Sequence, residues 1–135
     1  MNIEVVTPEI ALKEVTGWLD KKRVMGKERE KKQDEIDVMV DAVVNGILSI
    51  DEAGIITHKL LFPVEDKDGN IAIDTLSYRL RIDTATINQK LQGVKMDMSM
   101  ISAYGAALTG RLIGEVNKLD TQDSKILRTI ATFFM

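Results

Sequence analysis

The sequence predicts an α+β protein, a mostly helical single domain with one central antiparallel β-hairpin. Apolar residues recur at helical spacing in the first 50 residues and again after residue 97. Between them, much of residues 55–82 alternates apolar and polar side chains as strands do, and a polar turn containing Gly divides this stretch in two. A chain of 135 residues is long enough for one domain with its own core.

Composition excludes several classes of protein. Hydrophobic residues make up 44% and charged residues 29% of the chain, which argues against both wholesale disorder and a membrane-embedded fold. Cys is absent, so disulfides, thiolate metal sites and a cysteine nucleophile are excluded. No stretch approaches the roughly 20 apolar residues that span a bilayer, and the amino terminus lacks a basic flank before an apolar run. We therefore expect a cytoplasmic protein.

Residues 1–50 are expected to form an amino-terminal helical segment of two helices. Thr7-Pro8-Glu9 is typical of a helix start, because Thr caps, Pro suits the first helical position and Glu meets the positive end of the dipole. Gly26 is the expected break between the two helices. The residues expected on one side of the first helix are Leu12, Val15, Trp18 and Leu19. Those expected on the apolar face of the second are Ile36, Val40, Val43, Val44 and Ile47.

Positive charge gathers in residues 21–32, although the whole chain has a net charge of −3. The cations are Lys21, Lys22, Arg23, Lys27, Arg29, Lys31 and Lys32. Glu28 and Glu30 are interleaved among them, and no aromatic residue offers a surface for base stacking. A solvated helical face is therefore favoured over a nucleic-acid patch.

Residues 51–135 are expected to combine the β-hairpin with carboxyl-terminal helices. The first strand should run over 55–62 and end at Pro63, the second should run over about 71–82, and residues 66–70 should form the turn. The face of the second strand expected to be buried carries Leu76, Tyr78, Leu80 and Ile82. The face expected in solvent carries Ser77, Arg79 and Arg81.

Three further helices are predicted. Asp83 or Thr84 should cap a short helix ending near Gly93, Asp97 a longer one, and Asp120 a last one. The apolar residues expected on the longer helix are Ile101, Tyr104, Leu108, Leu112 and Val116. Its small residues, which would let another backbone approach, are Ser102, Ala103, Gly105, Ala106, Ala107, Gly110 and Gly114. The last helix carries an apolar side of Ile126, Leu127, Ile130, Ala131, Phe133 and Phe134.

No pattern of residues predicts an enzyme, a metal site or a cofactor. His58 is the only histidine, and it lies in a predicted strand without a second ligand at useful spacing. Residues 66–70 differ from a calcium loop, because the Gly comes two positions early and Ser77 stands where Glu is needed, so a hairpin turn is favoured. Asp120 and Asp123 have the spacing that capping and the helix dipole require, which is favoured over an acid pair.

Five short segments follow one another in a recognisable order: a strand with a Pro, an acidic turn with Gly, a strand with Leu and basic residues, a small-residue helical segment, and an Asp-rich start to the last helix. They are Lys59-Leu60-Leu61-Phe62-Pro63-Val64, Asp66-Lys67-Asp68-Gly69, Leu76-Ser77-Tyr78-Arg79-Leu80-Arg81, Ala106-Ala107-Leu108-Thr109-Gly110 and Leu119-Asp120-Thr121-Gln122-Asp123. In this order, residues 55–134 resemble the tail assembly chaperones of long-tailed bacteriophages, especially the small family typified by Mu-like phages. The first 50 residues depart from the compact pattern of that family, and the second strand lacks the Arg-Pro ending of many members.

The resemblance implies a protein that binds the tape measure protein in the host cytoplasm and shields its apolar helices during tail assembly. The expected partner-binding residues are Ile101, Tyr104, Leu108, Ile126, Ile130, Phe133 and Phe134. The alternative is that these faces form the domain's own core. Two other functions remain open: a structural component of a virion or other complex, and a nucleic-acid-binding regulator that uses residues 21–32. No membrane partner is expected, and homo-oligomerisation is left open.

Overall fold

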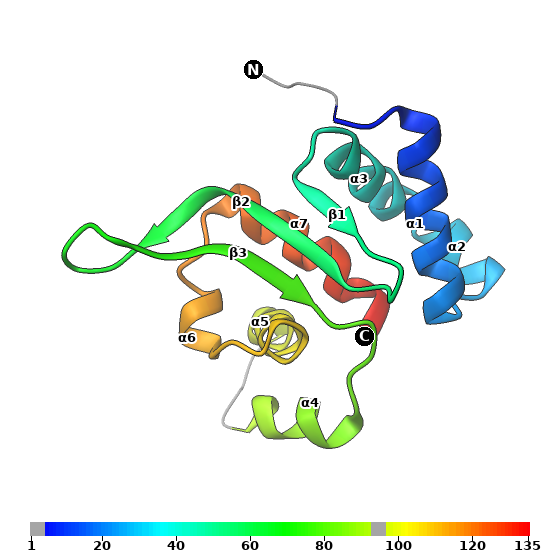
Figure 1. The fold of residues 1–135 in the computed structure, drawn as a ribbon. Helices are drawn as coiled ribbons and strands as arrows, with labels where there is room; N and C mark the ends of the chain where they lie inside the picture. The colour runs from blue at the N-terminus through cyan, green and yellow to red at the C-terminus, as the bar shows by residue number, and fades with distance from the viewer. Residues whose placement is uncertain (1–4, 93–96) are drawn as a thin grey trace.

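A computed structural model describes residues 5–92 and 97–135 and shows the predicted α+β fold, with helices around one antiparallel sheet (Figure 1). The helices are α1 (Pro8–Lys22), α2 (Gly26–Lys31), α3 (Gln33–Val44), α4 (Thr84–Leu91), α5 (Asp97–Thr109), α6 (Ile113–Val116), α7 (Thr121–Ala131) and the 3-10 helix η1 (Thr132–Phe134). The strands are β1 (Leu48–Ile50), β2 (Ile56–Glu65) and β3 (Ile71–Tyr78). Among the described residues, no helix is long and apolar enough to cross a membrane.

The amino-terminal segment has three helices in its described part, where the sequence predicts two. Thr7 caps α1 as expected, since its side chain accepts a hydrogen bond from the Ile10 amide at 3.3 Å. Helix α2 begins at Gly26, but a second break at Lys32 separates it from α3. The prediction for Leu12 is wrong, because its side chain is 51% exposed and Ala11 takes the buried position beside Val15.

The sheet has three strands in the order β1-β2-β3, one more than the predicted hairpin. Strand β1 was not predicted, and it pairs Leu48 with His58 on β2. Three residues are too short for a period of two to show in the sequence. The turn between β2 and β3 lies at the predicted place. There Asp66 accepts hydrogen bonds from the amides of Asp68 and Asn70, and Gly69 has a φ of +82°.

Pro63 does not end the first strand of the hairpin, contrary to the prediction. Strand β2 continues to Glu65, because residues 60–63 form an irregular bulge opposite Asp74 on β3. Inside a bulge the missing N–H of Pro63 removes no hydrogen bond of the ladder. The second strand ends at Tyr78 and not at residue 82, since the next amide, that of Arg79, donates to the Leu108 carbonyl of α5 at 3.0 Å.

The longer helix predicted after residue 97 is two helices, α5 and α6. Gly110 has a φ of +68°, and the Arg111 amide donates back to the Ala106 carbonyl at 3.1 Å, which closes the end of α5. Leu112 is consequently 66% exposed instead of continuing an apolar face. The preceding helix α4 ends at Leu91; the predicted end at Gly93 and the predicted capping by the Asp97 side chain lie outside what the structure describes.

One hydrophobic core joins residues 1–50 to residues 51–135 in the described part of the chain. Trp18 of α1 is 1% exposed and packs edge-on against Phe133, with 5.6 Å between the ring centroids. The amino-terminal helices therefore complete the core of the carboxyl-terminal part.

The small residues of α5 serve the packing of α5 on α7. A Cβ atom built on Gly105 would lie 2.5 Å from Cδ2 of Leu127, whose side chain is 1% exposed. The space beside Gly105 is therefore filled from within the domain, by the side chain of Leu127 and not by another backbone. Ala103 and Ala106 of the same helix are also buried, each 0% exposed.

We expect Gly105→Ala to lower the free energy of unfolding by about 1–3 kcal/mol, because the new methyl group would overpack a closed part of the core. Gly17→Ala is the control, since the space around Gly17 in helix α1 is open. That substitution should raise stability by roughly 0.5–1 kcal/mol, through the lower flexibility of the unfolded chain. Urea unfolding of both variants checks this, and equal effects would contradict it.

Candidate partner-binding site

The structure divides the seven residues predicted to bind a partner into two groups. Four are buried in the core of the domain: Leu108, Ile126, Ile130 and Phe133, none more than 8% exposed. Their burial supports the alternative that these side chains belong to the protein's own core. The remaining three, Ile101, Tyr104 and Phe134, are half-buried.

Phe134 lies in a groove of about 540 Å³ that three distant segments form together. Its lining residues are Lys21, Lys22, Arg23, Leu80, Arg81, Ile82 and Phe134. They come from the end of α1, from the segment between β3 and α4, and from η1. We call this the basic groove. Gly54 packs closely against two of these residues, because a Cβ atom there would lie within 3.3 Å of the side chains of Leu80 and Lys21.

A second hollow of about 220 Å³ shares Ile82 and Phe134 with the basic groove. It reaches Tyr104 on α5 and the apolar residues Ile87 and Leu91 on α4. We call this second hollow the apolar groove, after these side chains, although Asp83, Thr84 and Asn88 also line it. The two grooves adjoin at the shared residues, so the cations lie at the α1 end of one surface and most of the apolar side chains lie near α4 and α5. Of the seven predicted residues, Tyr104 and Phe134 are brought together here, whereas Ile101 lines a separate hollow between α5 and α7.

Positive charges crowd one another in the basic groove. Burial lowers the pKa of Lys22, and the positive charges of Arg81 and Lys32 lower it further, against the opposite effect of Glu28. The ammonium Nζ of Lys22 lies 3.5 Å from the centre of the Phe134 ring, a cation–π contact. Lys22 is thus partly shielded from water and carries its charge over an aromatic floor.

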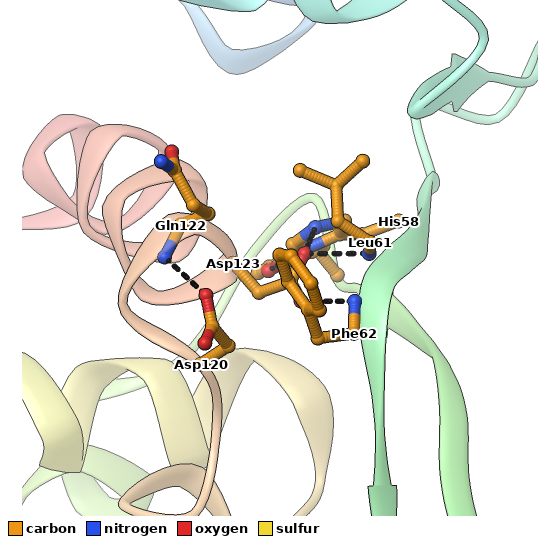
Figure 2. A network of polar contacts seen from close by, with 7 residues as sticks. His58, Leu61, Phe62, Asp120, Gln122 and Asp123 are labelled. Atoms are coloured by element: carbon orange, nitrogen blue, oxygen red, sulfur yellow. Dashed lines mark hydrogen bonds and ion pairs between the residues drawn. The ribbon is translucent and has the colours of Figure 1, made fainter. Parts of the chain in front are cut away.

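His58 and Asp123, which could suggest acid–base chemistry, form instead a buried polar network between β2 and α7 (Figure 2). The Asp123 carboxylate accepts hydrogen bonds from the amides of Leu61 at 2.9 Å and Phe62 at 3.0 Å, in the bulge of β2. Asp123 lies in the first turn of α7 as expected, but the expectation that it helps to cap this helix is wrong, because its oxygens accept from β2. Asp120 alone caps α7, by accepting from the Gln122 amide at 2.9 Å.

The proton positions in this network follow from its partners. A carboxylate accepts only, so His58 Nε2, 3.3 Å from Asp123, carries the proton and donates it. His58 Nδ1 then accepts from the Tyr78 hydroxyl at 2.8 Å. Burial lowers the pKa of His58 and raises that of Tyr78 well above its usual value, so His58 stays neutral and Tyr78 stays protonated.

The network joins the sheet to α7 and faces no solvent, since His58 and Asp123 are both 0% exposed. Both ring nitrogens of His58 and both carboxylate oxygens of Asp123 have a hydrogen-bond partner on a neighbouring strand or helix. Over residues 5–92 and 97–135, no group of three or more His, Asp or Glu side chains is placed to hold a metal ion.

Sequence reasoning missed most of the site. Arg81 was expected in solvent and is exposed, but its position beside Lys21 depends on how β3 leaves the sheet. Leu80 and Ile82 were expected to be buried and are only half-buried, because the strand ends before them. The sequence signal for the basic groove was the presence of cations at residues 21–23 and at residue 81. The sequence does not show that these two segments lie side by side in the fold.

Replacing Asp123 by Asn should lower the free energy of unfolding by about 2–3 kcal/mol, because an amide group cannot accept from both bulge amides and His58 at once. Asp120→Asn removes the same charge at the start of the same helix, and Asn caps as well as Asp, so it should cost little. Chemical denaturation of the two variants measures the difference. Similar losses in both would mean that only the helix-start charge matters.

Stability should fall on acidification below pH 6.5, the ordinary pKa of a histidine. Since burial lowers the pKa of His58 in the folded state, the unfolded chain binds this proton more readily. The contribution is fully present above pH 6.5 and is lost below it, by up to about 1.4 kcal/mol per pH unit. Urea unfolding between about pH 7.5 and 5.5 should show a steeper dependence for the wild type than for His58→Gln. Parallel curves would refute this role of His58.

Comparison of the chain with models of protein families, with curated proteins and with solved structures finds no match.

Proposed function

We propose that this chain is a non-enzymatic binding protein that acts as a phage tail assembly chaperone, holding apolar helices of the tape measure protein during tail morphogenesis. The proposal rests on the surface formed where the basic and apolar grooves adjoin. The order of motifs over residues 55–134 suggests the class of partner.

The apolar side chains of the two grooves carry the proposal. Leu80, Ile82, Tyr104 and Phe134 are half-buried, so each keeps apolar surface in contact with water while its base is fixed in the protein. An amphipathic helix is bound in this way, through an apolar stripe laid into a preformed groove. A long protein with many apolar helices offers repeated stripes of this kind.

The alternative function as a nucleic-acid-binding regulator is less favoured by the contacts of residues 21–32. Arg29 pairs with Asp20 at 2.8 Å and donates to the Val24 carbonyl, and Lys32 pairs with Glu28 at 3.3 Å and also donates to the Thr132 carbonyl. Arg29 and Lys32 therefore stabilise the fold through contacts within the protein. The three that line the basic groove converge on an aromatic and aliphatic floor, which suits a protein segment better than a smooth phosphate backbone.

Co-expression with a tape measure protein from the same phage genome tests the proposal. The wild-type chain should increase the soluble tape measure protein and co-purify with it, and Ile82→Asp should abolish both effects by placing a charge in the groove. Ile71→Asp is the matched control, since Ile71 is 63% exposed at the far end of β3. Circular dichroism and thermal unfolding verify that both variants fold.

Besides a failure of the wild-type chain to capture the tape measure protein, two results would contradict the proposal. One is loss of capture in Ile71→Asp with capture retained in Ile82→Asp, which would place the binding surface on the β2–β3 arm. The other is the presence of the chain in purified mature particles at a fixed stoichiometry, which would support the alternative of a structural virion component. A chaperone is expected to leave the tail when assembly is complete.

A further inference from the structure

The basic groove holds more positive charge than the fold requires. Lys21 and Lys22 lie in the last turn of α1, where cations are favoured by the helix dipole. That explanation does not extend to Arg81, which lies in the segment after β3 and is not part of α1. The fold nevertheless brings Arg81 to the same groove as Lys21, Lys22 and Arg23.

None of these four cations forms an ion pair within the described part of the protein, although the charge of Glu28 acts on Lys22. The ion pairs among residues 5–92 and 97–135 involve Arg29, Lys32, His58 and Arg111, and none of the four. The chain as a whole is acidic, with a net charge of −3, so four such cations in one groove are a local reversal of its charge. Crowded cations repel one another, and a bound anion relieves that repulsion.

The adjoining apolar groove makes the two ends of the surface chemically different. Its acidic lining residue, Asp83, is bonded to the Thr86 amide at 2.7 Å, where it caps α4. That contact keeps Asp83 an anion, because hydrogen bonding to Thr86 lowers the pKa of its carboxyl group. Near α4 and α5 the surface therefore combines apolar side chains with one carboxylate, and near α1 it is cationic. A ligand that matches both parts has an apolar stripe with carboxylates beside one end of it.

We infer that the two grooves together select a partner helix that is amphipathic and acidic, with Glu or Asp residues flanking one end of its apolar stripe. This inference rests on the proposed function and specifies the chemistry of the partner at the same site. The carboxylates lie over Lys21, Arg23 and Arg81, while the stripe contacts Ile82, Tyr104 and Phe134. Charge thus sets the orientation of the helix in the groove, and apolar contact supplies most of the affinity.

Two labelled synthetic peptides of about 18 residues, or five helical turns, test the inference. Both carry the same stripe of Leu and Ile, and Glu flanks one end of the stripe in the first and Lys in the second. Fluorescence anisotropy should show the acidic peptide binding about tenfold more tightly, as expected for a few rim charges. The difference should shrink when the salt concentration is raised from about 50 to 300 mM.

Charge-reversal variants test whether the preference for the acidic peptide depends on the cations of the basic groove. Lys21→Glu combined with Arg81→Glu should abolish or invert the preference for the acidic peptide. Lys31→Glu combined with Arg128→Glu changes the net charge equally at exposed positions outside the groove, and it should leave the preference intact. An unchanged preference in the first variant, or an equal loss in both variants, would overturn the inference.

Other outcomes separate this inference from the proposed function. Capture of the tape measure protein that depends on Ile82 but not on Lys21 and Arg81 would overturn the inference and leave the chaperone proposal standing. A charge-dependent peptide preference without capture would support the inference and contradict the chaperone proposal. Binding of labelled duplex DNA that depends on Lys21 and Arg81, with no peptide binding, would overturn both in favour of a nucleic-acid ligand.

Discussion

The Asp123 carboxylate is the contact on which the arrangement of sheet and helices depends. A bulge in a strand frees backbone amides from the ladder, and buried amides without partners cost free energy. Asp123 accepts from two of these amides, at Leu61 and Phe62, and so replaces the missing strand partner with a side chain of α7. His58, also on β2, donates a third hydrogen bond to this carboxylate. The bulge therefore becomes an attachment point for a helix instead of a defect.

This attachment has consequences for the candidate site. Helix α7 continues directly into η1, whose Phe134 forms the junction of the two grooves. Fixing the start of α7 on β2 also fixes where Phe134 lies relative to the segment that leaves β3. Trp18 secures the other side, since its ring packs against Phe133 and Phe134. The groove is thus held by the core as well as by the contact of Lys22 with the Phe134 ring.

Local signals in the sequence were sufficient for most of the helices and for the hairpin. Thr7, Asp83 and Asp120 cap the helices they were expected to cap, because capping depends on a few neighbouring residues. Features that depend on distant parts of the chain were not predictable. The role of Asp123 required knowledge of the bulge, and the end of α5 at Gly110 required a choice between a tolerated helical Gly and a terminating one.

The same distinction applies to the candidate site. Tyr104 and Phe134 were selected from helical periodicity, which identifies apolar faces but does not separate a core from a binding surface. Four of the seven predicted residues are buried, because a core face and a binding face have the same helical spacing. The cations of the groove come from positions about 60 residues apart, 21–23 and 81, and periodicity carries no information on their meeting.

The distribution of the groove along the chain has a consequence for when binding can begin. Its walls need Lys22 near one end of the sequence, Ile82 in the middle and Phe134 near the other end. During synthesis, the first two segments leave the ribosome well before the last, and until residue 134 has emerged and docked on Trp18 there is no floor between them. The complete groove therefore forms only after synthesis has passed Phe134, so a ligand that needs all three segments would bind the folded domain and not its earlier segments.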